Sequence, residues 1–215
     1  MRDVGQMAKS LNDKNRPALA IALAVNLTVF YLAVQTGMLF SAGSIDLIKG
    51  LIAAVPAGAG LILVGVLNAF LPPTAKARIV FLRWRNPLPG SRAFTELGPA
   101  DPRIDMAVLR RDHSPIPKDP IKQNTRWYQL YKSVETEPAV EDAHRQFLFT
   151  RDYASLALIM MVVLGIAGFF AIPSQPTAVA YFALLLLQFG LVARAARTHG
   201  HCMVTNVLAA KSAGK

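Results

Sequence analysis

Two histidines with an aspartate nearby in the sequence are the main candidates for catalysis in this chain. His113 follows Asp112 directly, and His144 lies two residues after Asp142. A hydrolase or transferase needs a nucleophile and a base that meet in space. Residues two apart on a helix do not face one another, and the segment Asp-His-Ser-Pro around His113 is typical of a loop. We therefore expect no enzyme, with a membrane enzyme that acts at the lipid interface as an alternative.

A second cluster holds potential metal ligands near the C-terminus. His199, His201 and Cys202 lie within four residues. Imidazole and thiolate groups bind zinc, but a closed zinc site needs four ligands, and no second cluster completes one. We expect no metal and no cofactor. Because Cys202 is the only cysteine, the chain also has no internal disulfide.

A third group of residues could contact anions. Gly90-Ser91-Arg92 offers backbone amides and a guanidinium, although no phosphate-loop spacing accompanies it. The preceding stretch, 74–85, mixes aromatic, aliphatic and cationic side chains, which favours anionic lipid headgroups. The alternatives are a nucleotide or another phosphorylated ligand, and packing of this stretch within the insert. The candidate membrane-interface or anion contacts are Lys76, Arg78, Arg83, Trp84, Arg85 and Arg92.

Four apolar segments are the elements that must position these residues. They span about 18–40, 50–71, 153–172 and 176–193. A helix needs about 20 apolar residues to cross a bilayer, and the first three segments reach that length without an ionised side chain. The fourth can extend, because Arg194 and Arg197 can snorkel at its end. Backbone amides must pair within lipid, so each segment should be a helix. The sequence predicts an all-α, polytopic membrane protein with four transmembrane helices in two hairpins.

The distribution of positive charge predicts the topology. The two terminal tails and the insert between the hairpins hold every Lys and Arg except Lys49. The positive-inside rule then places both termini and the insert in the cytoplasm, in a bacterial-type inner membrane. The predicted parts are a cytoplasmic N-terminal tail (1–17), a hairpin (18–71), a small helical cytoplasmic domain (72–152), a second hairpin (153–193) and a basic tail (194–215).

Neutral polar and small residues inside the membrane segments predict close helix packing. Asn and Gln at this depth usually bond to a neighbouring helix, and Pro56 should kink the second segment. No acid or base lies at depth, which argues against ion-coupled transport. A pore needs no such charge once several protomers assemble. The candidate pore or helix-packing residues are Asn26, Gln35, Ala54, Pro56, Gly58, Gly60, Asn68 and Gln188.

Proline and capping acids predict the helices of the insert. Helices should begin at Asp101-Pro102, Asp119-Pro120 and Glu137-Pro138, and the third should continue unbroken into the membrane. The prolines and glycine of 86–99 predict an extended loop. An apolar stripe from 127 to 134 predicts one packed face on the second helix. Its aromatic residues, which suit either a core or a partner interface, are Trp127, Tyr128 and Tyr131.

Together these patterns predict a non-enzymatic, oligomeric membrane protein whose cytoplasmic domain docks a soluble partner or ligand and controls the membrane helices, with pore formation as one version. The layout resembles, in its architecture, small bacterial membrane effectors of antiphage systems. That resemblance implies membrane permeabilisation on a cytoplasmic signal. The alternative is a structural anchor or assembly subunit of a larger complex. Expected partners are the lipid bilayer, further copies of the chain and a cytosolic protein. Nucleic acid is not expected as a primary ligand, because the insert has a net charge of only +4 and no RNA-binding motif.

Overall fold

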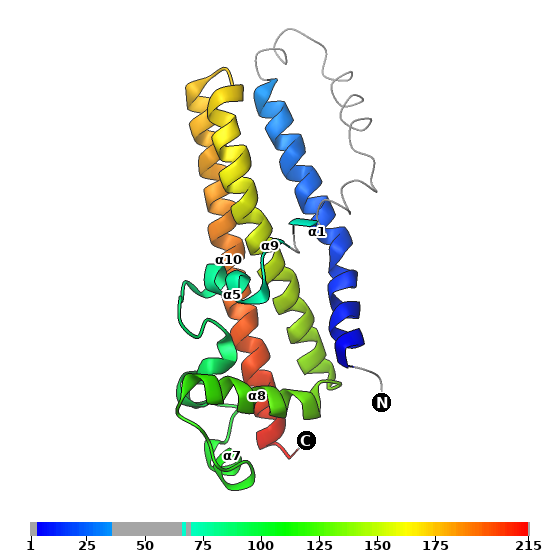
Figure 1. Cartoon of the computed structure of the whole chain (residues 1–215), viewed down its shortest axis with the longest axis vertical. Coiled ribbons are helices and arrows are strands. Elements are labelled where there is room, and N and C mark those ends of the chain that lie inside the picture. Colours follow the sequence, from blue (N-terminus) through cyan, green and yellow to red (C-terminus); the bar gives the residue numbers. More distant parts are fainter. Residues whose placement is uncertain (1–3, 36–65, 68–69, 215) are drawn as a thin grey trace. The chain divides into compact units, whose positions relative to one another are not determined.

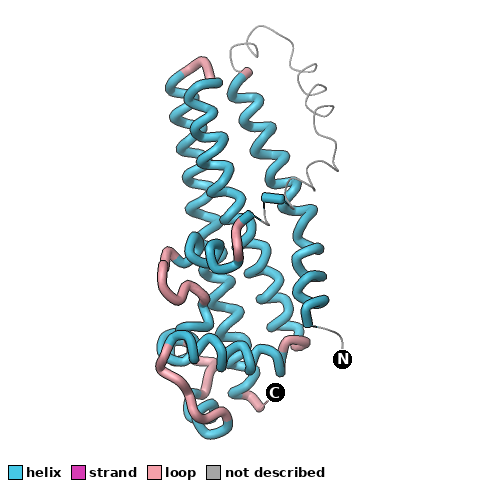
Figure 2. Tube along the Cα trace, viewed as in Figure 1, coloured by secondary structure: helices cyan, strands magenta, loops and turns pink. Residues whose placement is uncertain are grey.

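The computed structural model describes residues 4–35, 66–67 and 70–214, and all regular structure in these ranges is helical. The chain divides into two compact units. The first comprises residues 1–72 and 152–192, and the second comprises residues 73–151 and 193–215. Figure 1 names the helices, and Figure 2 separates them from the connecting loops.

Three helices among the described residues are long and apolar enough to cross a membrane. They are α1 (Val4–Val34), α9 (Pro138–Ala171) and α10 (Gln175–Ser212). The sequence predicts four such helices. Nearly all of the second predicted segment, 50–71, lies outside the described residues, so three of the four are found here.

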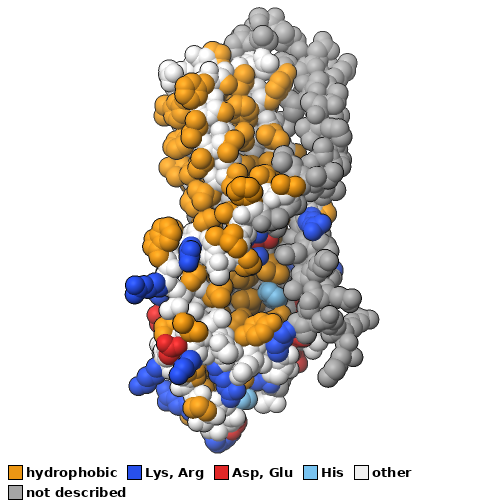
Figure 3. Space-filling view, viewed as in Figure 1, with side chains coloured by type: hydrophobic (Ala, Val, Ile, Leu, Met, Phe, Trp, Pro, Cys, Tyr) orange, Lys and Arg blue, Asp and Glu red, His pale blue; other side chains and the backbone are white. Residues whose placement is uncertain are grey.

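The first unit packs α1 against the apolar parts of α9 and α10. Its core cluster joins Ala33 of α1 to Ile172, Ala178, Tyr181 and Leu185. The rings of Phe30 and Tyr181 lie 5.8 Å apart between centroids. Apolar side chains also cover the visible outer face of this unit, as expected for a surface that contacts lipid (Figure 3).

Glycines let α9 and α10 approach closely within the first unit. A Cβ atom on Gly165 would lie 2.8 Å from the Phe182 ring, and one on Gly168 would lie 3.3 Å from Tyr181. Small residues at helix contacts in a membrane increase van der Waals packing, which there replaces the hydrophobic drive between helices. This pair is the predicted second hairpin, closed by residues 172–174.

The second unit contains short helices around the remaining parts of α9 and α10. These are α5 (Pro73–Phe81), a 3-10 turn (Pro89–Arg92), a π-helical turn (Ala93–Leu97), α6 (Gly98–Ala100), α7 (Met106–Asp112) and α8 (Pro120–Val134). The buried stripe of α8 matches its predicted face, since Trp127, Leu130 and Val134 are all buried.

Two of the three predicted helix starts are confirmed. Asp119 caps α8 by accepting a hydrogen bond from the Lys122 amide at 2.9 Å, and α9 begins at Pro138 and continues without a break to Ala171. The prediction at Asp101 is wrong. The carboxylate of Asp101 accepts instead from the Arg103 guanidinium at 2.7 Å, and Asp105 caps α7.

The predicted extended loop over 86–99 is also wrong, because residues 89–100 form successive helical turns. Pro89, Gly90 and Ser91 are buried. A Cβ atom on Gly90 would lie 2.7 Å from the Trp127 ring, so only glycine allows this close approach. Tertiary packing therefore decides the conformation of this segment.

The predicted basic tail, 194–215, is mostly helical and packed. Helix α10 continues to Ser212, and Val204, Val207 and Leu208 are fully buried in the second unit. Asn206 donates to the Ala139 carbonyl at 3.1 Å, and Arg197 donates through Nε to the Val80 carbonyl. This segment is a structural element of the second unit.

Candidate ligand-binding site

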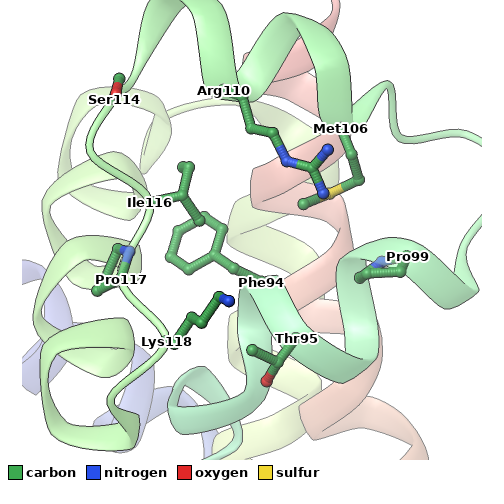
Figure 4. A pocket seen from close by; sticks show the side chains of 9 residues that line it. All are labelled: Phe94, Thr95, Pro99, Met106, Arg110, Ser114, Ile116, Pro117 and Lys118. Carbon is green, nitrogen blue, oxygen red and sulfur yellow. The ribbon is translucent and has the colours of Figure 1, made fainter.

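A cavity of about 510 Å³ in the second unit is the main candidate site. Its walls come from the turns at 94–99, from α7 and from the loop between α7 and α8. The lining residues are Phe94, Thr95, Pro99, Met106, Arg110, Ser114, Ile116, Pro117 and Lys118. Figure 4 shows the Phe94 ring beside Ile116, with Arg110 and Lys118 on different sides of it. Ligand pockets in proteins commonly have about this volume, with apolar walls and a few polar groups.

The buried amide of Gln123 on α8 holds two walls of this cavity together. Its Oε1 accepts from the Phe94 backbone amide at 3.1 Å, and its Nε2 donates to the Lys118 carbonyl at 2.8 Å. The same Nε2 also lies 3.1 Å from Thr95 Oγ1. Gln123 is only 1% exposed, so these bonds compensate for burying a polar group. One residue of α8 thereby fixes both the aromatic wall and the loop.

Helix α7 forms the third wall. Asp105 caps it with hydrogen bonds to the amides of Ala107 (2.8 Å) and Val108 (3.1 Å). Leu109 is fully buried, and its burial fixes the rotation of the helix. Arg110 is the next residue, and its exposed side chain borders the cavity.

The two cations that line the cavity, Arg110 and Lys118, differ from neighbouring arginines in their ion pairing. Arg111 lies 2.7 Å from the Asp112 carboxylate, and Arg103 lies 2.7 Å from Asp101, where its hydrogen bonds lower the Asp101 pKa to about 2. In the described part of the chain, no such acid pairs with the side chains of Arg110 or Lys118, and no acid lines the cavity. Their positive charge is therefore available to an anionic group.

A second cavity, of about 380 Å³, lies along the same loop and shares Ser114 and Pro117 with the first. Lys122 and Arg126 line it. Arg126 is already engaged, since it donates to the His113 carbonyl at 2.9 Å and to Gln129 at 3.1 Å. This contact holds the loop against α8.

Among the described residues, the candidate histidines and their neighbouring acids contact other groups. Asp112 is bonded to Arg111, and the burial of His113 together with Arg126 lowers the pKa of its imidazole below 6.5. His144 lies 2.8 Å from the Tyr131 hydroxyl, which is a structural contact between α8 and α9.

The histidines and the cysteine near the C-terminus make other contacts. No group of three metal-ligating side chains occurs within the described residues. His201 stacks on Phe81 with 5.7 Å between ring centroids, and Cys202 is exposed.

The predicted anion contacts fall into exposed and internal groups. Arg78, Arg83, Trp84 and Arg85 are exposed, with Trp84 83% exposed. Lys76 is buried.

Arg92 and Ser91, by contrast, make contacts within the second unit that stabilise its fold. The Arg92 guanidinium lies 3.2 Å from Glu96 and over the Phe81 ring, and Ser91 is buried.

The aromatic residues proposed as a core or a partner interface divide between the two roles. Trp127 is buried, and its indole donates to the Val204 carbonyl at 3.4 Å. Tyr131 is half-buried, whereas Tyr128 is 49% exposed. Of the three, Tyr128 offers the most surface to a partner.

Two of the predicted pore residues line one cavity in the first unit. Asn26 and Gln188 border a space of about 340 Å³ together with Tyr153 and Tyr181. Gln188 donates across helices to the Tyr153 hydroxyl at 2.7 Å, as predicted for a membrane amide, whereas Asn26 donates to the Ala22 carbonyl within α1.

The other predicted pore residues contribute less. Gln35 directly follows α1, and its backbone N–H donates to the Tyr31 carbonyl. Residues outside the described ranges are Ala54, Pro56, Gly58, Gly60 and Asn68.

Sequence reasoning missed Phe94, Arg110 and Lys118. The one local signal was a proline-rich segment, 114–120, flanked on both sides by cations. Comparisons of the chain with protein-family models, with curated proteins and with solved structures found no match.

Proposed function

We propose that this chain is a non-enzymatic membrane protein whose second unit receives a soluble ligand or protein and thereby controls the membrane helices. The chain crosses a bacterial-type inner membrane four times, and segment 50–71 is the second crossing in chain order. Both termini and the second unit lie in the cytoplasm. Several copies assemble, and their helices form a gated path for ions.

The observation that carries this proposal is the continuity of two helices. Residues 138–151 of α9 belong to the second unit and the rest to the first, and α10 passes between the units at 192–193 in the same way. The chain therefore changes unit within a helix at two places. A ligand that alters the second unit has two helical connections through which to act.

Charge supports the orientation. The second unit contains eighteen of the Lys and Arg residues against nine Asp and Glu, and lysines and arginines are retained on the cytoplasmic side of a membrane. The apolar segments contain no ionised side chain, which favours a neutral path over a proton relay.

Ion flux from liposomes tests the proposal. We expect potassium-loaded liposomes that contain the full chain to release potassium when the soluble fraction of the source cells is added on the side of the membrane that exposes the second unit. A variant with two glycines inserted after Arg151 and two more after Val192 should not release potassium, because the insertions interrupt both α9 and α10. The matched control is the same insertion after Ser174, in the exposed loop between α9 and α10, which should leave the release unchanged.

Two results would contradict the proposal in different ways. Impermeable liposomes under every condition, with a cytosolic protein still bound, would leave a structural anchor as the function. Equal flux from both insertion variants would show that helical continuity does not transmit the signal.

A further inference from the structure

We infer that the 510 Å³ cavity binds a soluble phosphate monoester that carries an aromatic or similarly flat apolar group. This inference rests on the proposed function, because it names the ligand that the second unit receives. The cavity combines two kinds of wall that such a molecule requires. Apolar side chains supply the first, and two cations on different sides of the Phe94 ring supply the second.

The apolar wall is preformed. Phe94 is only 4% exposed, and its backbone amide is held by Gln123, so the ring is fixed before any ligand arrives. Ile116 lies beside the ring in Figure 4. A planar apolar group placed here would bury its surface against Ile116 and the small exposed part of Phe94, at little cost in ordering the protein.

The cationic wall matches a doubly charged group. Arg110 comes from α7 and Lys118 from the loop, so the two charges reach the cavity from separate elements. A phosphate monoester carries close to two negative charges at neutral pH and presents three acceptor oxygens. The arginine fork suits a phosphate by bidentate hydrogen bonding, and the lysine adds a point charge. A single carboxylate would leave one of the two cations without a partner.

Hydroxyl groups complete the lining. Thr95 and Ser114 both border the cavity, and the Thr95 hydroxyl is oriented by Gln123. The exposed Ser114 hydroxyl offers a hydrogen bond to a sugar or to a ring nitrogen, whereas the Thr95 hydroxyl already donates to Gln123 and can only accept a further bond. The ligand class therefore extends from simple aryl phosphates to nucleoside monophosphates.

Calorimetric titration of the purified full chain in phospholipid-free detergent tests the inference. The probes are phenyl phosphate, adenosine monophosphate, inorganic phosphate, benzoate and benzyl alcohol. We expect saturable binding of phenyl phosphate and adenosine monophosphate, and at least roughly tenfold weaker binding of probes that lack either the ring or the second negative charge. Equal binding of benzoate and phenyl phosphate would overturn the phosphate assignment.

Matched variants locate the site. Arg110→Gln and Lys118→Gln should each weaken phenyl phosphate binding roughly tenfold, and Arg110→Lys should recover part of the loss. The control is Arg111→Gln, which removes the neighbouring exposed cation that pairs with Asp112 and should bind normally. Equal losses in Arg111→Gln and Arg110→Gln, or no saturable binding by the wild type, would overturn the inference.

Two further results separate this inference from its alternatives. Dihexanoylphosphatidic acid carries the same phosphate on a lipid. If it displaces phenyl phosphate at lower concentration than adenosine monophosphate does, the ligand is a lipid headgroup and the soluble assignment fails. Binding with the expected variant pattern but without ion flux would support the site and reject the proposed function, whereas flux without binding would do the reverse.

Discussion

The two units of this molecule hold their helices together by different interactions. The first relies on apolar side chains and glycines, with the Gln188–Tyr153 hydrogen bond as a neutral polar link. The second uses ion pairs and bonds from side chains to backbone, such as those of Gln123 and Arg103. Charged groups are costly in lipid and inexpensive at an aqueous surface. The difference favours the proposal that the second unit receives the ligand, because its surface carries the charged groups that recognition needs.

Helix α10 shows the same contrast within one element. In its first half, the exposed side chains include Leu187 (58%) and Leu191 (60%). Beyond residue 193, the exposed positions are Arg194, Thr198 and Cys202. The exposed surface of the helix therefore changes from apolar to mostly polar near the unit boundary, as expected if one half contacts lipid and the other contacts water.

The largest expected effect is a difference in stability between two variants, each of which removes one buried polar group, Gln123 in the second unit or the Tyr181 hydroxyl in the first. Gln123→Leu should destabilise the second unit by about 2–5 kcal/mol, because the Phe94 amide and the Lys118 carbonyl lose their partner. Tyr181→Phe in the first unit should change stability little or increase it, because that buried hydroxyl has no hydrogen-bond partner in the described structure. Denaturant unfolding in detergent, followed by tryptophan fluorescence and circular dichroism, measures both. A costly Tyr181→Phe and a neutral Gln123→Leu would reverse the comparison.

The next effect uses one substitution at two places in α10. Gly200→Ala should cost about 1–3 kcal/mol, because its Cβ atom would lie 2.7 Å from the Phe81 ring and 2.9 Å from the Phe147 ring. Gly190→Ala is the matched control. No atom of the described residues comes within 4 Å of its Cβ position, so the higher helix propensity of alanine should stabilise the helix by up to about 1 kcal/mol. Thermal melting of the two variants should shift in opposite directions, and shifts of the same sign would argue against the packing described.

A smaller effect measures the neutral link in the first unit. Tyr153→Phe, Gln188→Leu and the double variant form a double-mutant cycle across α9 and α10. The 2.7 Å hydrogen bond should give a coupling energy of about 0.6–1.7 kcal/mol, the range found between membrane helices. Additive effects of the two single substitutions would mean that the bond contributes nothing to the packing of the hairpin.

The smallest expected effect is a dependence on pH in the second unit. Burial and Arg126 lower the pKa of His113 below its ordinary 6.5, so the unfolded chain binds the proton more tightly than the folded one. The stabilisation is complete above about pH 6.5 and declines as the pH falls. The melting temperature should therefore drop less between pH 7.5 and 5.5 in His113→Asn than in the wild type. Identical pH profiles would mean that the imidazole is not desolvated.

The helix starts that the sequence predicts correctly are set by residues close to them in the chain. Asp119-Pro120 starts α8 because a carboxylate three residues away caps the Lys122 amide. Asp101-Pro102 carries the same signal but starts no helix, because Arg103 takes the carboxylate. The turns at 89–97 were unpredictable locally, since Gly90 packs against Trp127, which lies far along the chain.

The candidate site was less predictable than the fold. Its walls lie at 94–99, 106–110 and 114–118, and hydrogen bonds of Gln123 link the first and third. Gln123 shows no motif in the sequence. The buried residues Val204, Val207 and Leu208 did repeat at helical spacing, but the cations around them favoured a tail.

Labelling of cysteine with a membrane-impermeant maleimide tests the central claim most directly, namely that the second unit lies in the cytoplasm. The native Cys202 is exposed in that unit and is the only cysteine of the chain. We predict that it reacts in inside-out vesicles and not in spheroplasts. Ser174→Cys in a Cys202→Ala background, at the exposed loop between α9 and α10, should give the opposite pattern. Labelling of Cys202 in intact spheroplasts, or labelling of both positions from the same side, would contradict the account.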